Sequence, residues 1–149
     1  MTRLFILFFL LLSTTASVSA QVEKPYFQVF DISEDVKSIK IETADSFKVR
    51  KWNGVQLMVD MSIRLEGGTM DLLSVVIFDN RYAYESANQG SLLLIRPKMT
   101  HRENAKIKYM GTVCAEKIVM TVYIPDGFEM RSPTEFVKKE DVIIAAEKN

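Results

Sequence analysis

The sequence predicts a mostly β domain, in which antiparallel hairpins form a short β-solenoid or a sandwich-like structure. Two patterns lead to this fold class. Apolar and polar residues alternate through most of the chain after residue 35, and helical spacing is confined to one short segment near residues 69–78. The chain also contains one His and one Cys, which leaves few side chains for catalysis or metal binding. The sequence therefore favours a binding or scaffold domain over an enzyme.

The first twenty residues have the three parts of a secretory signal. Arg3 supplies a positive charge, residues 4–12 form the apolar run LFILFFLLL, and Val18 and Ala20 are the small residues before a cleavage site. This run is far shorter than the roughly 20 residues that a spanning helix needs, which argues against the alternative of a membrane anchor. We expect export with cleavage after Ala20, to the periplasm, the outer surface or the medium.

Residues 21–149 are enough for a single β-rich domain with its own core. We expect a body at residues 36–131 and a C-terminal tail at 132–149, with one strand in DVIIAA. The full chain has 19 basic and 19 acidic residues, interspersed along its length, so nucleic acid is not an expected partner. Cys114 has no disulfide partner. It is either a buried inert thiol or, as the alternative, a reactive or intermolecular one.

The body begins with two short alternating segments, VKSIKIET and SFKVRKW, which predict strands. Asn53-Gly54 follows, and this pair predicts a type I′ hairpin turn because both residues tolerate a positive φ. The turn leads into a long strand that stops at Gly67-Gly68. One face of that strand is wholly apolar, with Val55, Leu57, Val59, Met61, Ile63 and Leu65. Such a face must be covered by another layer.

The rest of the body alternates between turns and apolar segments. Thr69 is a suitable N-cap for a short helix that ends near Asn80, although the β-branched run at 75–77 makes this segment ambiguous. RYAYESANQGSLLLIRP predicts a hairpin with its turn at 88–90. The charged stretch up to Gly111 predicts a solvated loop with a weak strand. EKIVMTVYIPDGFEM then predicts a strand, a turn and the start of another strand.

The sequence offers little for catalysis, and we expect no enzyme activity, metal or cofactor. A Cys114/His101 pair is the one candidate for nucleophilic chemistry, and a solvated His is the simpler interpretation. Two Cys or His ligands are too few for the usual zinc site. A hydrolase with dispersed carboxylates is a third class of function, with Asp60 and Glu85 on the outward faces of their predicted strands.

Aromatic residues supply the candidate ligand-binding positions. Tyr82 and Tyr84 share one face of a predicted strand with Ser86, and Trp52 lies at the shoulder of a predicted turn. Exposed aromatic rings on a sheet stack on sugars or form the centre of a protein interface. Rings that cover the edge of the core are the structural alternative.

Three short motifs resemble a known family. They are Trp52-Asn53-Gly54 before a long strand, the hairpin with its turn at 88–90, and the step at 124–127, IPDG. Across residues 36–131 their order is similar to the bacterial adhesin domain family of secreted, auto-transporter-adhesin-like β-solenoids. The resemblance implies an exported surface module without catalytic residues. The chain departs from the family pattern after Met130, where further rungs would follow.

These observations lead to one functional hypothesis and one alternative. The first is an exported, non-enzymatic β domain of the bacterial cell envelope that serves as an adhesin-like binding or scaffold module. The alternative is a small-ligand or glycan-binding module that uses Tyr82, Tyr84 and Trp52. The expected partner is a protein or a glycan, and exposed strand edges allow association with a second copy of the chain.

Overall fold

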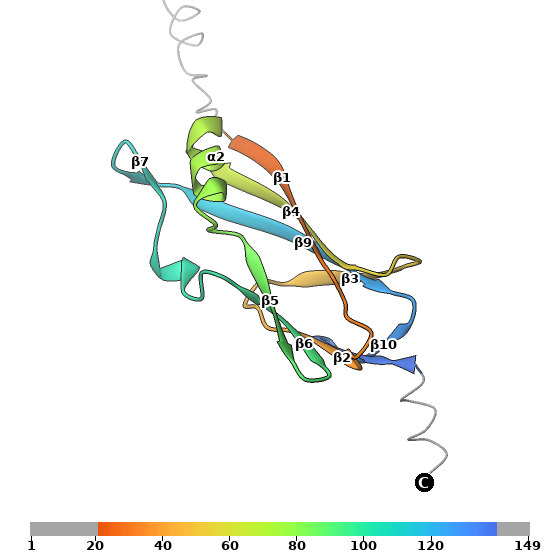
Figure 1. Ribbon diagram of the computed structural model, residues 1–149. Coiled ribbons are helices and arrows are strands. Elements are labelled where there is room, and N and C mark those ends of the chain that lie inside the picture. The colour runs from red at the N-terminus through yellow and green to blue at the C-terminus, as the bar shows by residue number, and fades with distance from the viewer. Residues whose placement is uncertain (1–20, 140–149) are drawn as a thin grey trace, which may run out of the picture.

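The computed structural model describes residues 21–139, which form a mostly β structure with one short α-helix (Figure 1). The predicted fold class is confirmed at this level. The elements are β1 (Gln21–Phe30), β2 (Ser38–Ile41), β3 (Phe47–Trp52), β4 (Leu57–Glu66), α2 (Met70–Phe78), β5 (Tyr84–Gln89), β6 (Leu92–Pro97), η1 (Arg102–Asn104), β7 (Lys108–Tyr109), β8 (Thr112–Val113), β9 (Ala115–Pro125), β10 (Phe128–Ser132) and β11 (Glu135–Lys138).

The strands form two larger sheets and one small hairpin. The first sheet has the order β1-β4-β9-β3, the second has the order β10-β11-β2-β6-β5, and β7 pairs with β8. Both larger sheets are mixed, because β3 runs parallel to β9 and β2 runs parallel to β6. The expected antiparallel pairing holds for six of the eight strand pairs among the described residues, and the two parallel pairs were not expected.

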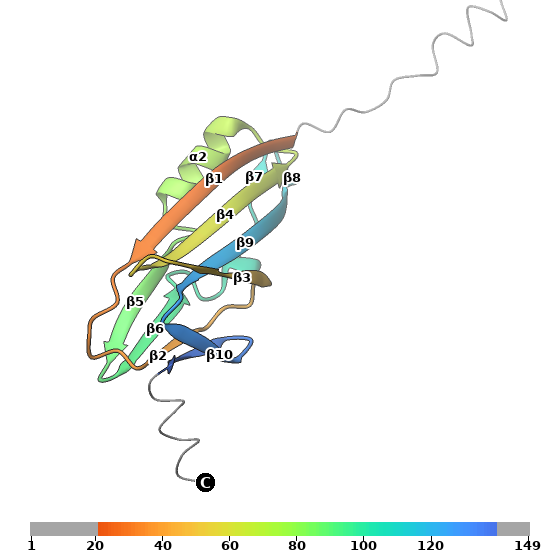
Figure 2. The same cartoon turned by 90° about the vertical axis from the view of Figure 1, so that its right-hand side faces the viewer.

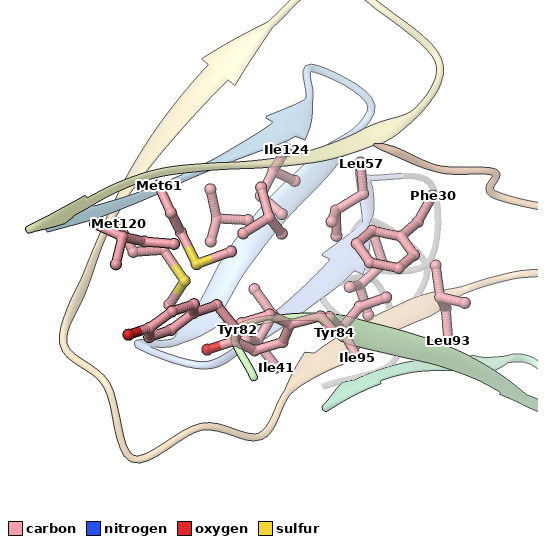
Figure 3. Packing of buried hydrophobic residues seen from close by; sticks show 14 of the residues in the cluster. Phe30, Ile41, Leu57, Met61, Tyr82, Tyr84, Leu93, Ile95, Met120 and Ile124 are labelled. Carbon is pink, nitrogen blue, oxygen red and sulfur yellow. The ribbon is translucent and has the colours of Figure 1, made fainter. Parts of the chain in front are cut away.

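The core lies between the two larger sheets (Figures 2 and 3). Strand β4 is hydrogen-bonded to β1 on one side and to β9 on the other. Its inward face is at most 1% exposed from Leu57 to Leu65, as predicted, but Val55, the first residue of the predicted apolar face, precedes β4 and is 81% exposed. In Figure 3, Leu57, Met61, Met120 and Ile124 of the first sheet face Ile41, Leu93 and Ile95 of the second. Each such side chain contributes roughly 1.5–3 kcal/mol by its burial.

Helix α2 lies beside β1, at the end of the molecule where β4 finishes (Figures 1 and 2). Thr69 is its N-cap, as predicted, and the Thr69 hydroxyl accepts a hydrogen bond of 3.2 Å from the backbone N–H of Leu72. Asp71 lies in the first turn, where a negative charge favours the helix. The chain leaves the helix through Asn80, which has a φ of 60°.

The predicted hairpin at Asn53-Gly54 is wrong. Neither residue has a positive φ, and β9 lies between β3 and β4 in the sheet. β4 and β9 are the longer partners, with 10 and 11 residues against six in β3, so their pairing along residues 58–66 buries more surface. Gly54 has a different role. A Cβ there would come within 2.2 Å of the Trp52 ring, so the glycine gives the indole room to fold over the loop.

Three strands were not predicted, β1, the two-residue β8 and β11, and one predicted strand lies outside the described residues. β1 was missed because its inward positions include Lys24 and Gln28, and Pro25 interrupts the middle of the segment. β11 was missed because four residues show little alternation. The predicted strand in DVIIAA belongs to residues 140–149, which the structure does not describe. The hairpin of β5 and β6 is confirmed, with Gly90 at a φ of 62° in its turn.

Replacement of Gly68 by alanine tests the tight turn between β4 and α2. A Cβ at Gly68 would lie 2.4 Å from Leu65 Cδ2, and Leu65 is fully buried, so the core must shift. We expect Gly68→Ala to lower the free energy of unfolding by about 1–3 kcal/mol in urea titrations followed by Trp52 fluorescence.

Gly127→Ala is the matched control. No atom lies within 4 Å of the Cβ position at Gly127, and its φ is not in the left-handed region, so we expect a change within about 0.5 kcal/mol. Equal effects of the two substitutions would contradict the close packing at Gly68.

Candidate functional site

The residues predicted to bind a ligand do not form an exposed aromatic face. Tyr82 and Tyr84 are 1% and 2% exposed, and their rings lie in the core below Met61 (Figure 3). Trp52 is half-buried, and its indole N–H donates to the backbone carbonyl of Gln56 at 3.0 Å. The prediction of an exposed face was wrong because Tyr82 precedes β5 and packs under the first sheet, while Ser86 remains outside. The rings of Tyr82 and Tyr84 are therefore not exposed for a glycan to stack on.

The two tyrosines belong to a buried polar cluster. Tyr82 donates a hydrogen bond of 2.7 Å to Glu116 Oε2, and Arg81 binds both oxygens of Glu116, at 2.6 and 2.9 Å. The guanidinium of Arg102 lies 5.4 Å from the centre of the Tyr82 ring and also pairs with Asp45. No buried side-chain nitrogen or oxygen among the described residues lacks a hydrogen bond. The cluster is satisfied internally.

Burial and hydrogen bonding shift the pKa values in this cluster. Burial alone raises the pKa of Glu116, but the hydrogen bonds from Arg81 and Tyr82 outweigh it and hold this pKa below its ordinary value of 4.5. Burial raises the pKa of Tyr82, and it raises the pKa of Tyr84 to about 12. Glu116 is thus held ionised and both phenols are held neutral, which suits a structural cluster better than an acid–base pair.

The structure also places the other residues that were considered for catalysis. Cys114 is buried, and its thiol donates to the backbone carbonyl of Gly67 at 3.4 Å, which confirms the interpretation of a buried thiol. His101 is exposed, at the start of η1. Asp60 and Glu85 lie on different sheets, and Glu85 pairs with Arg96.

A small hollow of about 100 Å³ lies on the outer face of the first sheet. Ser62 and Arg64 both donate hydrogen bonds to the carboxylate of Glu23 across the pair of β1 and β4. These bonds, that from Ser62 above all, lower the pKa of Glu23. A carboxylate with a lowered pKa is a weaker base than usual.

The larger opening is a groove between α2 and β1, with a volume of about 460 Å³. Val75, Ile77 and Phe78 line it from the helix, and Lys24 lines it from the strand. The Lys24 ammonium donates to the hydroxyl of Ser74 at 3.1 Å, so its aliphatic chain forms part of the wall. The groove is open and mainly apolar, and sequence reasoning missed it because β1 was not predicted.

Helix α2 is far more apolar than its position on the surface requires. Its sequence is MDLLSVVIF, yet Leu73 alone among these nine residues is buried, and Phe78 is 85% exposed. A helix that is apolar on all sides is normally buried on all sides. Asp71, Ser74, Val75 and Phe78 follow helical spacing along one stripe of the helix, and the last three of them line the groove.

The edge of β1 beside the groove is protected against pairing with another strand. β1 has one hydrogen-bonded neighbour among the described strands, which is β4. Pro25 offers no N–H at the middle of the free edge, and Lys24 places a charge on its inward side. Nearer the other end, the side-chain amide of Gln28 binds the backbone N–H and carbonyl of Tyr84 and so closes the gap to β5. Side chains, rather than a new strand, suit this groove.

Removal of the Glu116 carboxylate tests the polar cluster. Glu116→Ala leaves the Arg81 charge buried without its partner, so we expect a loss of about 3–5 kcal/mol in the free energy of unfolding at pH 7. A carboxylate whose pKa is lowered on folding stabilises the protein above pH 4.5, and this contribution disappears as the pH falls through the folded pKa. The difference between wild type and variant should therefore shrink below pH 4.5, as urea titrations across pH would measure.

The control is Glu85→Ala, which breaks the exposed pair with Arg96. The Glu85 and Arg96 side chains are 40% and 49% exposed, so we expect the free energy of unfolding to fall by less than about 1 kcal/mol. A loss of the same size at both sites would argue against a stabilising role for the buried cluster.

Comparison with known proteins leaves the groove to be interpreted from its own geometry. No protein-family model, curated protein or solved structure matches the chain. Across residues 21–139, no three acidic, His or Cys side chains gather as metal ligands would. Within the same residues, no helix has the length and apolar character to cross a bilayer.

Proposed function

We propose that the protein is an exported, non-enzymatic binding module of the bacterial cell envelope, and that a polypeptide partner binds in the groove between α2 and β1. The signal-like residues 1–20 support export. The resemblance to secreted adhesin domains supports a place at the envelope. The buried thiol of Cys114 and the weakly basic Glu23 support a role other than catalysis.

The exposed apolar surface of α2 carries this proposal. Met70, Val75 and Phe78 are 46%, 55% and 85% exposed, on a helix whose other apolar residues, Leu72, Leu73, Val76 and Ile77, pack against or within the core. A contiguous apolar surface beside a groove is typical of a protein-binding site, because burial against a partner removes it from water. Aromatic side chains such as Phe78 are common anchors of such interfaces.

The form of the groove indicates how the partner is held. The protected edge of β1 disfavours strand addition, so affinity comes from an apolar side chain inserted between Phe78 and the chain of Lys24. The Lys24 ammonium is engaged by Ser74, whereas Asp71 and Asp79 are exposed at the two ends of the helix. The partner segment is therefore apolar with basic flanks.

We infer that the domain is sandwich-like rather than a solenoid. Two sheets contribute to one core, and the parallel pairs are isolated within mixed sheets, whereas a solenoid stacks similar rungs. A domain of this kind has two ends and two outer sheet faces. The apolar groove lies at one of those ends.

A photoreactive amino acid at position 78 tests the proposal in intact cells. Because Phe78 lies in the partner's footprint, we expect irradiation to give a discrete adduct that gel mobility and mass spectrometry detect. A second substitution, Val75→Asp, should abolish this adduct, since a charge in the apolar groove has no partner there.

Position 55 supplies the control. Val55 is 81% exposed, similar to Phe78, but it precedes β4 whereas α2 follows it, so it lies at the opposite end of the strand. Similar adducts from positions 55 and 78, or an adduct at 78 that survives Val75→Asp, would show that the groove is not the binding site.

A further inference from the structure

The β7–β8 hairpin presents an apolar side chain in an unfavourable position. Its turn is Met110-Gly111, with φ angles of 49° and 81°, and Met110 is 88% exposed. Turns with two positive φ angles prefer Asn-Gly, and a long side chain such as Met rarely adopts this conformation. Met110 is thus unfavourable both for the backbone and for contact with water. A function at the tip would explain its presence.

The base of the hairpin is held by the core. Ile107 and Cys114 are buried on either side of it, and the backbone N–H of Cys114 donates to the carbonyl of Ile107 at 2.9 Å. Tyr109 also packs against the core. The tip therefore projects from a fixed base, and Met110 is available as a rigid apolar knob.

The charges near the knob complement those near the groove. Lys106 and Lys108 are exposed on the arm that leads to Met110. Asp71 begins the exposed stripe of α2, and Asp79 follows Phe78 at its end. Both views place α2 and the β7–β8 hairpin at the same end of the molecule, where β1 begins (Figures 1 and 2).

We propose that the partner is a second copy of this chain, whose Met110 seats in the groove between α2 and β1. This inference rests on the proposed function of the groove. The groove volume of about 460 Å³ accommodates a methionine side chain, and Lys106 and Lys108 then approach Asp71 and Asp79 of the other copy. Knob and groove lie at the same end, so a two-fold axis brings both contacts together in a closed dimer.

The first test is light scattering after size-exclusion chromatography, over a range of concentrations, of the purified wild-type protein and Met110→Asn. Asn-Gly is the preferred pair for this turn, so the variant should fold with an equal or higher melting temperature. We expect the wild type to have twice the monomer mass, and the dissociation constant of Met110→Asn to rise by about tenfold or more. A dimer unchanged by this substitution would overturn the inference.

A charge-reversal pair tests the geometry more sharply. One variant combines Lys106→Glu with Lys108→Glu, and the other combines Asp71→Lys with Asp79→Lys. Each variant alone sets like charges against each other and should be monomeric. In an equal mixture both contacts are complementary again, glutamate against lysine in one and lysine against aspartate in the other, so the dimer should return. A mixture that stays monomeric overturns the inference.

The outcomes separate this inference from the proposed function. A wild type that is monomeric at every concentration, with a cross-link from position 78 to another polypeptide, overturns the dimer and leaves the groove as a binding site. A cross-linked adduct of twice the monomer mass supports both. A monomer without any groove-dependent adduct overturns both.

Discussion

The need to cover the inward face of β4 determines the architecture. Its residues from Leu57 to Leu65 alternate without interruption, and they are buried along the full length of the strand. β5, β6 and β2 in the second sheet face one part of this surface, and α2 lies at the end where the strand finishes (Figures 1 and 2). At that end of the strand the covering element is the helix and not the second sheet. The apolar helix therefore remains on the surface with one side packed and the other exposed.

The polar cluster lies where the covering layer changes from helix to sheet. Arg81 and Tyr82 lie in the short connection between α2 and β5, and Glu116 reaches them from the start of β9. The low dielectric of this position makes the ion pair strong, but it also makes any missing partner costly. Mutual satisfaction of these groups fixes the path of the chain from helix to second sheet. The same path leaves Phe78, at the end of the helix, outside the core.

Local signals in the sequence predicted where the helix and strands lie better than they predicted which strands pair with one another. The apolar alternation of β4, the Thr69 cap of α2 and the β5–β6 hairpin each depend on residues close together, and the structure confirms all three, with the hairpin turn at 90–91 instead of the predicted 88–90. The position of β9 between β3 and β4 depends on the relative lengths of strands far apart in the chain. Asn53-Gly54 permits a hairpin but does not impose one, and longer pairing elsewhere stabilises the sheet more.

The candidate binding surface was harder to predict than the helices and strands, because whether a side chain is buried depends on the whole fold. Tyr82 and Tyr84 have the composition of a binding face, but their rings are in the core and their hydroxyls are occupied. The groove depends on β1, whose alternation is hidden by Lys24 and Pro25, the same residues that protect its edge. An edge protected against strand pairing beside an exposed Phe78 agrees with the proposed binding through side chains and not through a new strand. The unfavourable Met110 at the same end of the molecule is consistent with that selection.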